Sequence, residues 1–244
     1  MDEKPDWLEK DFTRKTILDR AHLSVQEISE LGIGWIISSF VILYITGNLY
    51  IIVLEGRIPD TLLIYLFVLG IAFFTHELFH KFIAIKFGAK AYFRLSRQGL
   101  FLTLISVIIG FPILATGAVF WWGEATASPG IRGRVSAAGP LSNLILAGIS
   151  LIIQGIGWML LIDIPDIGLI LYIIGSFGVW LNVFLGVFNL LPLGVLDGAK
   201  VLAWDPKIWI SLMGSLLVIG FFGGDFIPFL YQGQGGGFLG PYQG

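Results

Sequence analysis

Two histidines and a glutamate stand out in the stretch Phe74 to His80 (FTHELFH). On a helix, His76 and His80 lie four residues apart, so their imidazoles project from one face, close enough to share a metal ion. Glu77 is turned by about 100° from His76 on such a helix. Its carboxylate then lies beside a metal-bound water, where a general base belongs. The spacing therefore predicts a hydrolytic metal site.

The composition places this stretch in a membrane. Of the 244 residues, 56% are hydrophobic and 13% charged, with a mean hydropathy of +0.85, whereas soluble domains are about a quarter charged. The twelve residues Leu62 to Phe73, ahead of the motif, carry no charge. We therefore expect an integral membrane protein in a lipid bilayer. A net charge of −2 without a basic cluster predicts no nucleic-acid partner.

The metal-binding residue types are few. The chain has no cysteine and only three histidines, of which His22 lies outside the motif. A metal site must therefore complete its ligand set with a carboxylate. The alternative is that His76 and His80 are interior histidines hydrogen-bonded across helices, although ionisable residues inside membrane spans are functional by default.

Apolar segments of membrane-spanning length, about 20 residues, recur along the chain. They cover residues 31–54, 61–87, 135–161, 168–191 and 208–231. Residues 100–122 are also apolar, but Gly110-Phe111-Pro112 interrupts them and basic residues flank both ends, which favours a re-entrant or interfacial segment. The preceding Ala91 to Leu102 partly alternates, as a strand or hairpin would. Lys81 and Lys86 are expected to extend toward a membrane interface.

The predicted fold class is an all-α polytopic membrane protein. It has about five to six transmembrane helices, with a re-entrant or β-hairpin segment between the second and third. Residues 1–30 form a charged cytoplasmic arm, residues 31–231 a single transmembrane catalytic domain, and residues 232–244 a flexible Gly/Gln-rich tail. The charged N-terminus does not have the pattern of a cleavable signal peptide.

The distribution of basic residues predicts the orientation. Lys and Arg are enriched in the N-terminal arm and in three alternate loops, so we expect these at the cytoplasmic side of the cell membrane. His76 lies 15 residues beyond Thr61, or roughly 22 Å along a helix. The candidate site is therefore predicted past the midplane, toward the cytoplasm.

Asp197 is the favoured third ligand. It follows the fourth span, where Pro192 removes a backbone hydrogen bond and Gly194 and Gly198 loosen the chain, so an unwound segment can fold back to the histidines. Glu124, a loop residue, remains a rival, and an ordinary Asp-Gly turn is the structural alternative for Asp197. The remaining candidates are predicted at the far side or farther along the inside loop: Asp163, Asp166, Asp205 and Asp225.

These motifs together resemble a known family. His76-Glu77-x-x-His80, followed by Asn189-x-x-Pro192-x4-Asp197-Gly198, resembles the site-2 protease family of intramembrane zinc metalloproteases. Gly139-Pro140-Leu141-Ser142-Asn143 looks like that family's further motif on an intervening helix. The resemblance covers about Phe74 to Gly198, with the elements in the family's order.

The resemblance implies a zinc-dependent metalloendopeptidase with one Zn2+ per chain. It implies His76, His80 and Asp197 as zinc ligands and Glu77 as general base. Asn143 and Asn189 would hold substrate or stabilise the oxyanion, or would simply be interhelical hydrogen-bond partners. The implied substrate is a transmembrane protein cut within its membrane span, as in regulated intramembrane proteolysis. The strand-like Ala91 to Arg97 could hold the unwound substrate by edge pairing.

Two alternatives remain open at this point. One is a non-enzymatic metal-binding transporter or scaffold, although a structural site does not need Glu77 and we find no internal repeat typical of transporters. The other is a zinc membrane peptidase acting on soluble peptides or prenylated tails. The physiological substrate, regulating partners and oligomeric state do not follow from the sequence.

Overall fold

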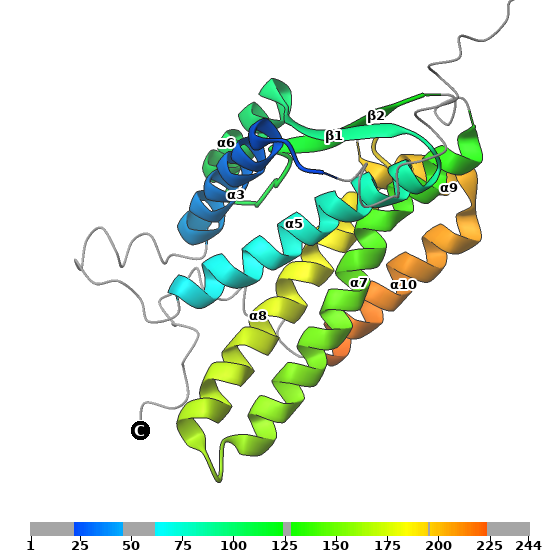
Figure 1. Cartoon of the computed structure of the whole chain (residues 1–244). Helices are drawn as coiled ribbons and strands as arrows, with labels where there is room; N and C mark the ends of the chain where they lie inside the picture. Colours follow the sequence, from blue (N-terminus) through cyan, green and yellow to red (C-terminus); the bar gives the residue numbers. More distant parts are fainter. Residues whose placement is uncertain (1–21, 46–61, 124–127, 195, 224–244) are drawn as a thin grey trace, which may run out of the picture.

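The computed structural model describes residues 22–45, 62–123, 128–194 and 196–223. In chain order the elements are α3 (Val25–Ile45), α5 (Leu62–Lys86), β1 (Lys90–Leu95), α6 (Arg97–Ile109), β2 (Gly117–Trp122), α7 (Pro129–Leu160), α8 (Pro165–Asn189), α9 (Asp197–Trp204) and α10 (Pro206–Phe222). In Figure 1, α5 runs obliquely across the pair formed by α7 and α8, and the two-stranded sheet lies at the end where α9 is found.

Four described helices, α3, α5, α7 and α8, are long and apolar enough to cross a membrane. The chain is thus a multi-pass membrane protein, and the predicted fold class with its hairpin between the second and third spans is confirmed. The first span begins at Val25, six residues before the predicted Leu31, so the predicted arm boundary falls inside α3. The fifth predicted span corresponds to the 17-residue α10, and its predicted end lies outside the described residues. The proposed division into arm, catalytic domain and tail stays a prediction.

The segment between the second and third spans is a strand, a short helix and a returning strand. β1 pairs with β2 antiparallel, from Lys90 opposite Trp122 to Leu95 opposite Gly117. Between them, the Ser96 side chain caps α6 by accepting from the Gly99 N–H, and Gly110 ends the helix at φ 74°, a left-handed conformation that suits glycine. The predicted re-entrant or interfacial segment, residues 100–122, thus contains most of α6 and all of β2, and the predicted hairpin is formed by the strands on either side of α6.

The core of the bundle depends on close packing between α7 and α8. A Cβ at Gly157 would meet the backbone of Tyr172 and Gly168, and a Cβ at Gly175 would meet the backbone of Gln154. Small residues that let two helix backbones approach are typical of helix pairs in membranes, where van der Waals contact replaces the hydrophobic effect as the driving force. This pair forms the frame on which α5 lies.

Lys81 corrects one expectation from the sequence. Its side chain does not extend to an interface but is 2% exposed, with Nζ 2.7 Å from Oε1 of Glu27 on α3. The reason is that the first turn of α3 packs against α5 at this level. The same Glu27 oxygen also accepts the backbone N–H of Phe93 in β1, at 3.1 Å. One buried carboxylate thus joins α3, α5 and the sheet.

A second carboxylate of α3 covers the same edge of the sheet. Glu30 Oε2 accepts the backbone N–H of Leu95 at 2.9 Å. Alternate residues of a strand direct their backbone groups to the same side, so the backbone N–H groups of Phe93 and Leu95 both face away from β2. The outer edge of β1 is therefore occupied by Glu27 and Glu30, which protects it from pairing with another strand.

We expect Lys81→Met to destabilise the protein by about 3–5 kcal/mol, because it leaves the Glu27 carboxylate buried without its cation. Lys86→Met on the exposed side of the same helix is the matched control and should change stability by less than about 0.5 kcal/mol. Thermal unfolding of both purified variants in one detergent measures the difference. Equal stabilities would contradict a structural role for the ion pair.

Candidate metal centre

The two histidines and the glutamate lie in the second half of α5, where the helix passes α7 and the end of α8. All three are buried, with exposed fractions of 6% for His76, 8% for Glu77 and 7% for His80. The helix predicted from the spacing is present, and it places both imidazoles on one face. Their buried polar atoms then require partners from the neighbouring elements.

An unwound segment returns Asp197 to this level. α8 ends at Asn189, two tight turns follow in which Leu193 N–H donates to Leu191 O and Leu196 N–H to Leu193 O, each at 2.8 Å, and α9 begins at Asp197. A Cβ at position 198 would collide with the carbonyls of Leu190 and Leu191, so only glycine allows this close return of the chain. The fold-back expected from Pro192 and the glycines brings Asp197 to the histidines.

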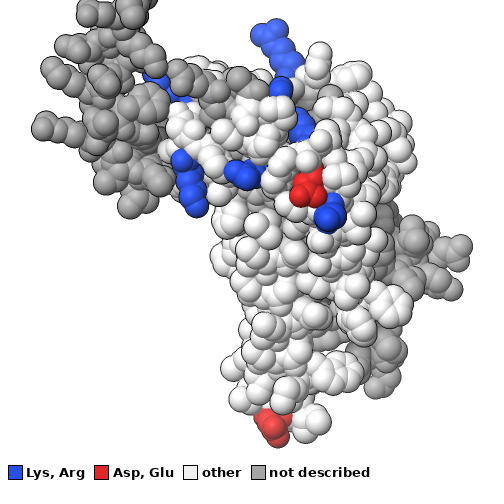
Figure 2. Space-filling view, turned by 90° about the vertical axis from the view of Figure 1, so that its right-hand side faces the viewer, with Lys and Arg blue, Asp and Glu red and all other residues white. Residues whose placement is uncertain are grey.

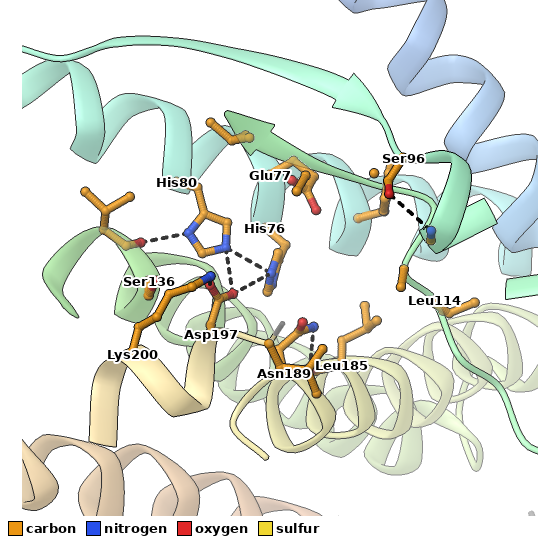
Figure 3. A pocket seen from close by; sticks show the side chains of 18 of the residues that line it. His76, Glu77, His80, Ser96, Leu114, Ser136, Leu185, Asn189, Asp197 and Lys200 are labelled. Atoms are coloured by element: carbon orange, nitrogen blue, oxygen red, sulfur yellow. Dashed lines mark hydrogen bonds and ion pairs between the residues drawn. The ribbon is translucent and has the colours of Figure 1, made fainter. Parts of the chain in front are cut away.

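The three side chains converge (Figure 3). Oδ2 of Asp197 lies 3.0 Å from Nε2 of His80 and 3.7 Å from Nε2 of His76. The two Nε2 atoms are 3.1 Å apart, and one ligand atom from each residue lies within 4.8 Å of the others. The geometry suits a metal ion held by three protein ligands.

The opposite ring nitrogens show why this cluster needs a cation. Nδ1 of His76 lies 2.6 Å from Oδ1 of Asn143, and Nδ1 of His80 lies 2.7 Å from the carbonyl oxygen of Val135. These oxygens only accept, so both Nδ1 atoms donate a proton, and in the neutral imidazoles both Nε2 atoms present a lone pair. In that neutral state two lone pairs and a carboxylate oxygen meet in a buried space, an arrangement that positive charge stabilises, whether it comes from protons or from a metal ion.

The charge state of Asp197 suits this arrangement. Burial alone would raise the pKa of its carboxyl, but positive charge on the imidazoles of His80 and His76, which a metal ion would replace, outweighs that effect and holds the pKa well below its usual range. Asp197 is therefore ionised and can serve as a metal ligand. Two histidines and a carboxylate are a donor set of catalytic zinc sites, in which three protein ligands leave a fourth position for water or substrate.

Gly139 of α7 keeps the space for an ion open. A Cβ at this position would press against the Nε2 atoms of both His80 and His76. Position 139, where α7 passes His76 and His80, therefore accommodates only glycine. The sequence placed Gly139 in a motif, and the structure supplies the physical reason for glycine there.

A cavity of about 450 Å³ opens beside the cluster. Glu77 borders it next to His76 (Figure 3), and its Oε2 is buried with no hydrogen-bond partner among the described residues. An unpartnered carboxylate oxygen next to a metal site is available to take a proton from water. The cavity wall is built by α5, α6, β2, α7, the end of α8 and the start of α9; its polar lining residues include Ser96, Gln98, Arg132, Ser136, Asn189 and Lys200.

The two predicted asparagines occupy different places. Asn189 borders the cavity, and its Nδ2 donates to the carbonyl of Leu185 at 2.9 Å. Asn143 lies behind His76, fully buried, and is absent from the cavity wall. Its two polar groups contact His76 and Asn182. The substrate or oxyanion roles of both asparagines stay predictions.

The other acidic residues are placed as follows. Asp163 lies in the turn joining α7 and α8, and Asp166 in the first turn of α8; this end of the two helices is opposite the sheet (Figure 1). Asp205 caps α10 by accepting the N–H of Lys207 at 2.9 Å. Glu124, the rival ligand, and Asp225 lie outside the described residues.

Sequence reasoning missed two groups that orient the histidines. One is the carbonyl of Val135, which as a backbone group has no signature in the sequence. The other is Asn182 of α8, whose Oδ1 accepts from Nδ2 of Asn143 at 3.0 Å. An amide within the apolar run Trp180 to Phe184 was the available signal, because a polar side chain in a membrane span needs a partner.

The comparisons with known proteins agree with the site. The chain is 36% identical over 203 residues, 81% of this chain and 96% of the other, to a Methanocaldococcus jannaschii protein named "Putative zinc metalloprotease MJ0611". It is also 36% identical over 166 residues, 59% of this chain and 70% of the other, to "Putative zinc metalloprotease YwhC" of Bacillus subtilis. No protein-family model and no solved structure matches the chain.

Gly139→Ala should abolish stoichiometric metal binding, because the added methyl group would occupy the space between the two Nε2 atoms. Gly148→Ala on the same helix is the control, since a Cβ there meets nothing within 4 Å and alanine favours a helix by about 0.5–1 kcal/mol over glycine. Metal content of the purified proteins distinguishes them. Full metal content in Gly139→Ala would refute the placement of the ion.

Proposed function

Because the chain belongs to the site-2 protease family of zinc metalloproteases, we propose that it is an intramembrane protease that hydrolyses peptide bonds within the transmembrane segments of membrane proteins. The observation that carries the proposal is the convergence of His76, His80 and Asp197 beside the unpartnered Glu77, between helices of membrane-spanning length. A purely structural metal site, as in a transporter or scaffold, would not require Glu77. We propose one Zn2+ per chain, held by those three ligands.

In the proposed mechanism the residues of the chain position a water and move its proton. Bound zinc supplies Lewis acidity to the water and to the peptide carbonyl. Glu77 takes one proton from the attacking water and delivers it to the leaving amine, so that one water is consumed and an acid and an amine are released. Glu77 is buried at the cavity wall, which keeps the proton that it transfers away from bulk solvent.

A transmembrane substrate must unwind before it can react, because a helix satisfies its own peptide groups. β2 supports a way to hold the unwound segment. The backbone N–H groups of Phe93 and Leu95 face away from β2. The residues opposite them in the sheet, Val119 and Gly117, therefore direct their own backbone groups away from β1. Both residues line the cavity. We therefore assign edge pairing with substrate to β2 instead of to Ala91 to Arg97, whose outer edge Glu27 and Glu30 already occupy.

The charge distribution supports the predicted orientation. On the face shown in Figure 2, Lys and Arg gather over one half of the molecule, and the charged side chains visible at the opposite tip are acidic. The basic end holds the start of α7 and all of α9, which also supply Val135 and Asp197 to the site. Because cytoplasmic loops are enriched in Lys and Arg, we propose that the N-terminus is cytoplasmic and that the cavity takes its water from that side.

Glu77→Gln should keep its zinc and lose cleavage of a membrane-spanning test substrate by about 10²–10⁴-fold, the contribution of a general base. Asp166→Asn, the same chemical change at the far end of the bundle, should cleave at the wild-type rate. Mapping the cut bond by mass spectrometry separates cleavage inside the span from cleavage of a soluble tail. Wild-type activity in Glu77→Gln would contradict the role of Glu77 as general base.

Asp197→Ala should lose zinc, because two imidazoles remain and a tetrahedral catalytic site needs three protein ligands. Glu124→Ala and Asp163→Ala should retain one zinc per chain, which tests the rival ligand and a distant carboxylate together. Metal analysis after dialysis against a chelator gives the result. Undiminished zinc in Asp197→Ala would overturn the ligand assignment.

A further inference from the structure

A chain of buried hydrogen bonds crosses the helix interface behind the candidate metal centre. It begins at the backbone carbonyl of Gly178 in α8, which accepts from Nδ2 of Asn182 at 2.9 Å. Oδ1 of Asn182 accepts from Nδ2 of Asn143 in α7 at 3.0 Å. Oδ1 of Asn143 then lies 2.6 Å from Nδ1 of His76 in α5. Asn143 and Asn182 are 0% and 2% exposed, so water does not compete at these positions.

The direction of every bond in this chain follows from its first member. A backbone carbonyl only accepts, so Asn182 must turn its amide nitrogen toward Gly178 and its oxygen toward Asn143. Asn143 must then present its nitrogen to Asn182 and its oxygen to His76. An oxygen facing Nδ1 places the imidazole proton on Nδ1 and leaves Nε2 free. One backbone carbonyl therefore fixes the tautomer in which His76 can bind a metal ion.

We propose that Asn182 is a positioning residue for the metal centre, acting through Asn143 to hold His76 in its metal-binding tautomer. The inference rests on the proposed function, because it gives His76 the role of a zinc ligand. Asn182 is absent from the cavity wall, so it acts on the site only through Asn143.

The second histidine provides an internal control. Nδ1 of His80 faces the backbone carbonyl of Val135 directly, and no side chain stands between them. A change at Asn182 therefore affects the tautomer of His76 and leaves the proton on Nδ1 of His80 unchanged. A general loosening of the fold would affect both histidines.

Two substitutions distinguish a role in this series of hydrogen bonds from Gly178 to His76, here called the tautomer relay, from a role in packing alone. Asn182→Leu has a similar volume but offers no acceptor, so the Asn143 amide is orphaned in either orientation and His76 populates both tautomers. Asn182→Asp still presents an oxygen to Asn143, and as a buried acid it is neutral and can donate to Gly178. It should therefore preserve the direction of the chain and rescue the site.

The experiment uses the full chain, labelled with 15N-histidine, purified in detergent and freed of metal with a chelator. Because the chain has only three histidines, their ring nitrogens can be assigned by NMR from His22→Gln and His80→Gln spectra. We expect the Nδ1–H tautomer at His76 in the wild type and in Asn182→Asp, and a mixture in Asn182→Leu. Titration with Zn2+ against a competing chelator should show affinity about tenfold weaker in Asn182→Leu, the lower end of the range for losing a partner around a metal ligand, and near wild type in Asn182→Asp.

The Nε2–H tautomer at His76 in the wild type would overturn the proposal, and that measurement needs no variant to fold. Wild-type tautomer and affinity in Asn182→Leu, or equal losses in both variants, would also overturn it. Neither readout involves cleavage, so a chain that binds zinc through this relay yet cleaves no peptide would refute the proposed function alone. A wild type that binds no Zn2+ would overturn the positioning role of Asn182 together with the metal centre, even if His76 keeps its tautomer.

Discussion

Three electron-pair donors meet at the wall of an internal cavity, and much of the structure holds them there. Nε2 of His76, Nε2 of His80 and Oδ2 of Asp197 repel one another unless a cation lies between them. Each is held from behind: the first imidazole by Asn143, the second by the carbonyl of Val135, and the carboxylate by the tight turns before α9. The close return of the chain at Gly198 serves the same end, since it places the carboxylate within reach.

The surrounding helices must supply hydrogen-bond partners that water would supply in a soluble protein. Inside a bilayer a polar group must find its partner in protein, so the amides and carbonyls around the site form closed pairs instead of solvated surfaces. Backbone groups terminate the two paths that orient the imidazoles, at Gly178 and Val135. Because main-chain carbonyls only accept and sit in rigid helices, they fix proton positions more reliably than side chains, which can rotate.

Much of this could be predicted from local signals. The four-residue spacing of His76 and His80, the apolar span lengths and the broken segment before Asp197 are encoded in consecutive residues, and the structure places these elements as expected. What could not be predicted depends on contacts between distant segments. The burial of Lys81 follows from Glu27, 54 positions away, and the place of Asn143 behind His76 follows from Asn182, 39 positions away. No local pattern specifies which helices meet at a given depth.

The pairing of Glu27 with Lys81 bears on how the protein enters the membrane during synthesis. Glu27 lies in the first turn of α3, so its carboxylate can stay hydrated at the bilayer surface while that helix inserts alone. Lys81 leaves the translation machinery 54 residues later and arrives near the end of α5. Burial of either charge before the other is available would be costly. The ion pair between α3 and α5 can therefore form only after α5 has been translated, and the contact of Glu27 with the sheet only after β1 has followed.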